Sequence, residues 1–370
     1  MWTSMPFDLL SNIFSFLSPD SLALAKSTCR HWRACANEYP LSKTPSSSLK
    51  HHLPWFVALP TRYPDLFCYV LNPTSFKWHI LPLKFLPFHI RPIAPIDGLM
   101  LFRPTSPTVL QLGVCNPFTR QFRRLPMTNI ARTSPAVGFV VLGSRQCTLR
   151  EFRVYVAGGM SEAPSGGATY EPTLEMYDSS NGTWKIVESM PTEFAIRLTV
   201  WTTNESVYSN GVLYWITSAR AYCIMALEIE SNRWQELSVP MADRLEFATL
   251  VQRNGSLTLV GGTGLSGASV WELNEGNIWC LIEEVPVELG LKLTNWGCTK
   301  CVGGEGVICL YSNVGSGMVV WRENGDSGKW EWFWVEGACS VKGKQVQNLS
   351  VKGVLVHPSL ALSYIDCFWQ

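Results

Sequence analysis

Apolar side chains recur at helical spacing near the start of the chain. They follow steps of i, i+1, i+4, i+5 and i+8, with polar residues such as Asp8 and Asn12 between them. The recurring positions are Leu9, Leu10, Ile13, Phe14 and Leu17. This pattern predicts a helix that begins near Pro6, because a proline fits the first helical turn, where no amide donor is needed. The run Ser18-Pro19-Asp20 ends it and starts a second helix in the same way.

A third short helix is expected around Trp32, and the helical pattern then stops at Pro40. A chain of about 40 residues buries too little surface to be stable alone. The first 40 residues are therefore expected to form a small all-α unit that binds a partner.

Residues 41–52 lose the apolar periodicity and are rich in Ser, Pro and Lys, which predicts a linker. Beyond the linker, residues 53–370 show an internal repeat in which a polar residue ends an apolar strand and an aromatic residue follows six positions later. The pairs are Asn72…Trp78, Asn116…Phe122, Asp178…Trp184, Glu228…Trp234 and Asn324…Trp330, and Trp279 fits with Leu273 in the polar place. The aromatic residues recur about every 50 positions, a period typical of propeller blades.

Turn signals occur at two places in these repeats. Asn210-Gly211 and Asn254-Gly255 come before strands, while Asn181-Gly182 comes just before a repeat aromatic. Such pairs favour tight hairpins, because both central residues must tolerate a positive φ. Two hairpins in a repeat give four antiparallel strands, and six such sheets arranged radially make a β-propeller. Either Val354–Val356 or 361–363 is expected to supply the strand that closes the ring. A β-sandwich is the main rival, but it does not explain the repeat.

Composition narrows the possible partners. The net charge of +1 gives no bulk attraction to nucleic acid or to an anionic membrane. No apolar run approaches the roughly 20 residues that span a bilayer, and no leader for secretion is recognisable. The 12 cysteines are then expected to be reduced thiols in a cytoplasmic or nuclear protein. The 16 tryptophans and the low charged fraction of 16% suit aromatic strands.

Motifs that would indicate catalysis or a cofactor are weak. The string Gly262–Gly267 matches G-x-G-x-x-G, but a strand follows it where a dinucleotide site needs a helix. Cys298-x-x-Cys301 lacks the second pair of ligands that a structural zinc requires. Histidine is nearly absent between residues 90 and 356, which argues against a copper oxidase site built from histidine and tyrosine ligands, and no G-x-S-x-G elbow is present. We expect neither catalysis nor a cofactor or metal.

The N-terminal unit resembles an F-box over roughly residues 4–40. The matching segments are Met5-Pro6, Asp8-Leu9-Leu10, Ile13-Phe14, Phe16-Leu17, the Leu22 helix and Cys29…Trp32. The usual Leu-Pro is replaced by Met-Pro in this chain. F-box proteins are substrate receptors of cullin-based ubiquitin ligases, and the F-box docks on a Skp-type adaptor. The resemblance implies that the adaptor-binding residues are Pro6, Leu9, Leu10, Ile13, Leu17 and Leu22, with Trp32 helping to close the domain.

The repeats resemble degenerate kelch repeats. Val156-Ala157-Gly158-Gly159 with Tyr177 and Trp184 matches best, and Leu259-Val260-Gly261-Gly262 with Trp279 is next. The double glycine is missing or displaced in the other repeats. An F-box followed by kelch repeats is an arrangement common in plants, so the whole chain resembles a plant F-box/kelch-repeat protein.

A basic residue follows each of five repeat aromatics, in the segment that joins one predicted blade to the next. These residues are Arg91, Arg132, Arg197, Arg244 and Lys292. Equivalent loops gather on one face of a propeller around the mouth of its channel. Five cations there would focus a positive potential, and arginine pairs well with carboxylate or phosphate. We expect this face to bind an acidic or phosphorylated segment of a target protein; five unrelated solvated side chains are the alternative.

The chain is therefore expected to be a non-catalytic substrate receptor. It would bind a Skp-type adaptor, and through the adaptor cullin, as well as an unidentified target protein. No nucleic-acid or membrane partner is expected. Two alternatives stay open. The propeller pocket could bind a small molecule and act as a ligand-dependent sensor, for which a dry aromatic pocket would be the sign. The chain could also bind the adaptor outside any ligase.

Overall fold

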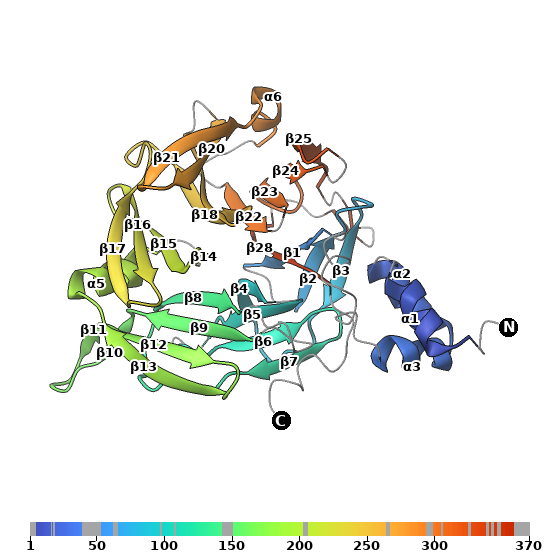
Figure 1. Ribbon diagram of the computed structural model, residues 1–370, viewed down its shortest axis with the longest axis horizontal. Coiled ribbons are helices and arrows are strands. Elements are labelled where there is room, and N and C mark those ends of the chain that lie inside the picture. Colours follow the sequence, from blue (N-terminus) through green and yellow to red (C-terminus); the bar gives the residue numbers. More distant parts are fainter. Residues whose placement is uncertain are drawn as a thin grey trace.

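A computed structural model of the chain contains a three-helix unit and a ring of six sheets (Figure 1). It describes residues 5–38 without 16 and 18, and residues 53–358 without some short internal stretches. Those stretches are 62–65, 97, 107–108, 143–150, 203–205, 264–266, 294–298, 305, 325–326, 338–339, 342–343 and 346–348. The predicted linker and the alternative closing strand at 361–363 lie outside the described residues.

The three expected helices form at the N-terminal end. They are α1 (Phe7–Ser15), α2 (Pro19–Thr28) and α3 (Arg30–Glu38). Leu10 donates its backbone N–H to the carbonyl of Pro6 at 3.0 Å, so the proline stands at the start of α1 as its chemistry favours. Six small or apolar side chains from the three helices share one core: Leu10, Phe14, Leu22, Ala25, Cys35 and Ala36.

Six antiparallel blades follow, and each contains four strands. From the innermost strand outward, blade one contains β28 (Val351–Val356), β1 (Trp55–Pro60), β2 (Phe67–Leu71) and β3 (Trp78–Pro82). Blade two contains β4 (Ile90–Ile96), β5 (Leu99–Pro104), β6 (Gly113–Asn116) and β7 (Gln121–Arg124). Blade three contains β8 (Ala136–Val141), β9 (Phe152–Ala157), β12 (Thr173–Asp178) and β13 (Thr183–Ser189).

The other three blades repeat this order. Blade four contains β14 (Val207–Ser209), β15 (Val212–Ser218), β16 (Tyr222–Glu228) and β17 (Arg233–Ser238). Blade five contains β18 (Phe247–Arg253), β19 (Ser256–Thr263), β20 (Gly267–Asn274) and β21 (Ile278–Glu284). Blade six contains β22 (Lys300–Gly304), β23 (Val307–Tyr311), β24 (Met318–Glu323) and β25 (Trp330–Val335).

The remaining elements lie in loops, one between β9 and β12 of blade three and the others between blades. They are the hairpins β10 (Met160–Glu162) with β11 (Ala168–Tyr170) and β26 (Ser340–Val341) with β27 (Lys344–Gln345), and the helices α5 (Thr192–Val200) and α6 (Val287–Gly290).

The C-terminal strand β28 closes the ring, because it is the innermost strand of the first blade. It pairs antiparallel with β1, with Val354 opposite Val57. The sequence prediction of a six-bladed propeller closed by Val354–Val356 is confirmed, and the sandwich alternative is wrong. Closure joins the two ends of the propeller in one sheet, so β1 has a partner strand on both sides.

The repeat aromatics all lie at or near the start of an outermost strand, and three tryptophans link neighbouring blades. The indole Nε1–H of Trp78 donates to the carbonyl of Glu336 at 2.9 Å, and that of Trp184 donates to Pro126 at 2.8 Å. Trp279 donates to Ser238 at 2.9 Å. Each acceptor belongs to the preceding blade or the loop after it, so the aromatic of these three repeats joins two blades.

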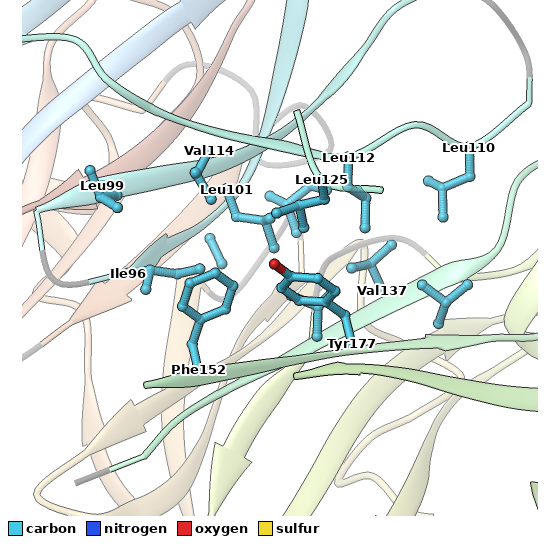
Figure 2. Close-up of a cluster of buried hydrophobic side chains, with 14 residues drawn as sticks. Ile96, Leu99, Leu101, Leu110, Leu112, Val114, Leu125, Val137, Phe152 and Tyr177 are labelled. Carbon is cyan, nitrogen blue, oxygen red and sulfur yellow. The ribbon is translucent and has the colours of Figure 1, made fainter. Parts of the chain in front are cut away.

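The cores lie between neighbouring blades. In Figure 2, Leu101 and Val114 of blade two face Phe152 and Tyr177 of blade three in one buried cluster. The packed sheets leave no apolar face uncovered there. This packing fixes the blades around a central axis, where the innermost strands surround an open space.

The ring has two faces that the strand directions define. Neighbouring strands are antiparallel, and each outermost strand leads into the innermost strand of the next blade, so all six innermost strands run the same way. We call the face where they begin the front face and the opposite one the rear face. Trp55, the first residue of β1, pairs with Val356 at the end of β28. The chain from the three-helix unit therefore enters the propeller at the rear face.

Candidate docking face and central cavity

Helix α1 carries apolar side chains on two sides. Leu10 and Phe14, one turn apart, are buried in the three-helix core. Leu9 and Ile13, also one turn apart, are 52% and 43% exposed. Pro6, at the start of the same helix, is exposed as well. We call Pro6, Leu9 and Ile13 the α1 docking face, because exposed apolar neighbours on a helix are suited to cover by a partner.

Two residues expected to bind the adaptor do not lie on this face. Leu10 and Leu22 are buried at 0% and 2% exposure, so a partner cannot reach them, and the expectation of direct contact is wrong for both. Their role in the described structure is to hold the helices together. The pattern of apolar residues could not separate the two sides, because it marks every apolar position alike.

The other two expected residues, Leu17 and Trp32, are neither fully buried nor fully exposed. Leu17 and Trp32 are partly buried against the three-helix core. The Trp32 ring lies edge-on to Phe14 with 5.5 Å between the ring centroids, where it closes the core as the resemblance implies. His31 also fixes α3 against the start of α1, because its Nε2 lies 2.8 Å from the carbonyl oxygen of Met5.

The innermost strands of the propeller surround a central cavity of about 2320 Å³. All six of them contribute lining residues, and Figure 1 shows them gathered around the middle of the ring. Aromatic side chains such as Phe139, Tyr208 and Phe247 lie in the wall among charged and small residues. The volume exceeds the roughly 300–1,000 Å³ of an ordinary small-molecule site.

The five sequence-predicted cations all follow an outermost strand, which places them toward the front face, but they are not gathered at one site. Only Arg91, exposed on β4, lines the cavity. Arg197 on α5 pairs with Glu236 at 2.8 Å. Arg244 is exposed in the turn before β18, and the Lys292 ammonium lies 5.2 Å from the centre of the Trp334 ring. For these four, binding of a target stays a prediction.

Arg132 does not lie on the target-binding face, and the sequence prediction is wrong for this residue. The residue is 1% exposed, and its guanidinium lies 2.5 Å from the Glu175 carboxylate inside blade three. It also donates to the backbone carbonyls of Gly158 and Thr173. Burial lowers the pKa of Arg132, and the neighbouring Glu175 opposes that shift. The side chain is a buried structural cation, so it cannot contact a target at the surface.

Four further cations line the cavity and were not predicted from the sequence: Arg103 on β5, Lys300 on β22 and Lys352 on β28 toward the front, and Arg322 on β24 toward the rear. They lie in short strands, and the sequence gives no sign of which strand residues face the central cavity. The Lys300 ammonium donates to the carbonyl of Val351 at 2.6 Å, which ties the start of β22 to the start of β28. A cation inside an otherwise apolar strand is the only signal that the sequence offers for them.

Chemistry that needs a metal or a reactive thiol has little support in the described part of the chain. No three His, Cys, Asp or Glu residues there are grouped so that they could hold a metal ion. Cys301 and Cys309 are buried free thiols, and burial raises the pKa of Cys309 to about 12. Cys298 lies outside the described residues. No described helix has both the length and the apolar character to span a bilayer.

Comparison with known proteins covers both parts of the chain. Residues 2–46 match a family model described as F-box-like, and residues 72–280 match one described as F-box associated beta propeller domain. Protein UNUSUAL FLORAL ORGANS of Arabidopsis thaliana is 22% identical over 90% of this chain and 78% of its own length. F-box only protein 6 of the same plant is 25% identical over 84% of this chain and 65% of its own length. An F-box/kelch-repeat protein of Arabidopsis thaliana is 24% identical over 76% of this chain and 72% of its own length.

Proposed function

This chain is a plant F-box protein and belongs to the family with an F-box associated beta propeller domain, and from that premise we propose that it is the substrate-recognition subunit of a Skp–cullin–F-box ubiquitin ligase. The F-box docks on the Skp-type adaptor and through it on cullin, while the propeller holds a target protein. The observation that carries the proposal is the presence of two separate surfaces in one chain: the apolar α1 docking face and the open, cation-lined cavity.

The docking face supports the adaptor half of the proposal. Full burial of a leucine or isoleucine side chain contributes about 1.5–3 kcal/mol. Leu9 and Ile13 keep roughly half of their surface exposed, so covering both would contribute about 1.5–3 kcal/mol together. The buried core beneath them, Leu10 and Phe14, holds α1 in place before the adaptor arrives, which keeps the ordering cost of docking low.

The direction of the chain supports the target half. The F-box segment joins the propeller at the rear face, where β1 begins beside the end of β28. The front face carries the longer loops, including α5 between blades three and four and the β10–β11 hairpin within blade three. Loops on a rigid scaffold are common binding surfaces, and these lie on the face away from the F-box junction. We assign target capture to the front face and the front mouth of the cavity.

The chain's contribution to ubiquitin transfer is then proximity and orientation. Holding the target and the transfer enzyme in one assembly makes an encounter between them effectively intramolecular. The thioester that carries ubiquitin belongs to the partner enzyme, so this chain needs no catalytic group of its own in the proposed role.

Adaptor binding tests this proposal directly. The full chain carrying Leu9→Asp and Ile13→Asp should bind a recombinant plant Skp-type adaptor at least about 100-fold more weakly, because about 2.8 kcal/mol is lost when both apolar contacts are replaced by carboxylates. Affinity is measured by isothermal titration calorimetry. Ala23→Asp, an exposed charge insertion on α2, is the matched control and should bind within about threefold of the parent.

Circular dichroism and the thermal unfolding midpoint check that the double variant keeps its F-box helices. Adaptor binding within tenfold of the parent by a folded Leu9→Asp, Ile13→Asp chain would contradict the proposed docking face.

A further inference from the structure

The charged residues of the cavity wall are divided between its two ends. Four cations line the front half: Arg91, Arg103, Lys300 and Lys352. Each lies at or next to the front end of a strand in blades six, one and two, which are neighbours in the ring. One described carboxylate, Glu246 before β18, lines the front half, on the side of blade five. The front mouth is thus basic along one side, whatever the net charge of the chain.

Two pairs make up this basic side. Arg91 and Arg103 are direct cross-strand partners on β4 and β5, so their side chains begin side by side. The Lys300 ammonium sits at the start of β28, 2.6 Å from the carbonyl oxygen of Val351 and 3.2 Å from the Ser350 hydroxyl oxygen. Lys352 is the next residue along that strand. We call these four residues the cation crescent.

The rear half of the wall has a different balance. Its described charged residues are Arg322 and the carboxylates Glu323 and Glu331 of blade six. The Arg322 guanidinium lies 4.9 Å from the centre of the Phe333 ring, against the wall between blades six and one. The cavity is therefore polarised from a basic front to a rear with more carboxylates than cations. Low-dielectric walls focus such a field at the mouth.

Resting on the function proposed above, we propose that the cation crescent is the target-recognition site and that it binds an acidic segment of the target protein, one that carries carboxylates or a phosphate group. The segment enters the cavity at the front mouth. Its anionic groups pair with the guanidinium groups of Arg91 and Arg103, which can bind carboxylate or phosphate through two parallel hydrogen bonds. Lys352 and Lys300 add charge from the neighbouring blades.

The size of the cavity favours a polypeptide segment over a small metabolite. A volume of about 2320 Å³ is more than twice the upper range of ordinary small-molecule pockets.

Peptide binding by the full chain, in complex with its Skp-type adaptor, tests the proposal. The probes are three fluorescein-labelled octapeptides: one of glutamate, one of glycine and serine with a central phosphoserine, and one of glutamine. Fluorescence anisotropy should show that one or both anionic peptides bind at least tenfold more tightly than the glutamine peptide, and that the affinity falls as salt rises. The two anionic probes distinguish carboxylate from phosphate as the preferred group.

The variant Arg91→Gln, Lys352→Gln should bind the preferred anionic peptide at least tenfold more weakly than the parent chain does. Its matched control is Lys185→Gln, Arg233→Gln, which removes the same charge from exposed residues on the outermost strands β13 and β17 that do not line the cavity. The control should bind within twofold of the parent. If the first variant does not fold, Arg103→Gln, Lys300→Gln takes its place, with the same expected loss.

Three results would overturn the proposal: equal binding of the glutamine and anionic peptides, equal losses in the crescent variant and its control, or tighter binding of a single-stranded oligonucleotide than of either anionic peptide. Adaptor affinity is measured in the same samples and should not change in any of these variants. If the crescent does not bind acidic peptides, the parent chain still binds the adaptor. If the proposed ligase role is wrong, the parent chain itself does not bind the adaptor.

Discussion

At the residue scale, Arg132 and Glu175 form an ion pair with both side chains fully buried. Taking two charges out of water is costly, and the cost is met only when every polar atom finds a partner. The Glu175 carboxylate also accepts from the backbone N–H groups of Asn129 and Ile130, while Arg132 donates to Thr173. The pair therefore ties the loop before β8 to the middle of blade three. A basic residue that the sequence analysis assigned to the surface is part of the core.

The buried pair should be far more sensitive to substitution than a surface pair. Arg132→Met should lower the free energy of unfolding by about 3–5 kcal/mol, because it leaves the Glu175 charge buried without its cation. Arg153→Met, which breaks the partly exposed pair with Asp178, is the matched control and should cost about 1 kcal/mol or less. Urea unfolding of the full chain measures both, and a cost below about 1 kcal/mol for Arg132→Met would contradict this account.

Some of the proposed binding residues could be predicted from the sequence, and others could not. Leu9 and Ile13 could be singled out from helical spacing and from the F-box resemblance, but their exposure, against the burial of Leu10, depends on which side α2 and α3 cover. The cation crescent could not be found in the same way. Lys300 and Lys352 come together only because a strand from the C-terminal end closes the ring beside β22.

At the element scale, each outermost strand begins after the same turn. The residue two places before the repeat aromatic has a positive φ in all six blades. The residues are Phe76 (53°), Arg120 (61°), Gly182 (69°), Asn232 (54°), Asn277 (61°) and Gly328 (63°). In blades one and two the turn is further stabilised by Asn72 and Asn116, whose side-chain oxygens accept backbone N–H groups of the turn. The shared geometry places every aromatic at the same point on its blade.

This turn also explains which elements the sequence could predict. The pairs Asn181-Gly182 and Gly276-Asn277 predict turns, since glycine and asparagine tolerate a positive φ. Phe76 and Arg120 occupy the same conformation with side chains that usually avoid it, so nothing local marks those two turns. They were recognisable only from the spacing of Asn72…Trp78 and Asn116…Phe122 in the repeat.

Relieving the strain at such a turn should stabilise the protein. Arg120 is exposed, and Arg120→Gly should raise the free energy of unfolding by about 0.5–1 kcal/mol. The left-handed conformation costs an ordinary residue about 1–2 kcal/mol, which glycine avoids. The greater flexibility of glycine in the unfolded chain offsets part of this stabilisation. Asn232→Gly is the control and should change stability by only a few tenths of a kcal/mol, since asparagine already tolerates this conformation. Destabilisation by Arg120→Gly in urea unfolding would show that the arginine side chain stabilises the turn.

At the scale of the whole molecule, the two ends of the propeller meet in blade one. The strand that follows the F-box, β1, and the strand from the C-terminal end, β28, are neighbours in one sheet. Gly353 sits at this junction with no room for a side chain, because an added Cβ would lie 2.4 Å from the Phe56 ring. This junction is closely packed, and the F-box chain enters at the rear face while the cation crescent lies at the front. The two binding surfaces thus belong to different parts of the molecule and should fail independently.

Quantifying the bound partners of three forms of the chain can show whether the two surfaces act independently. The parent chain, Leu9→Asp with Ile13→Asp, and Arg91→Gln with Lys352→Gln are each expressed in plant cells under proteasome inhibition, and bound proteins are quantified by mass spectrometry. The docking-face variant should lose the Skp-type adaptor and cullin at least tenfold while keeping the target proteins. The crescent variant should do the reverse. If either variant loses both sets of partners while still folded, or if neither loses any, the two-surface account is contradicted.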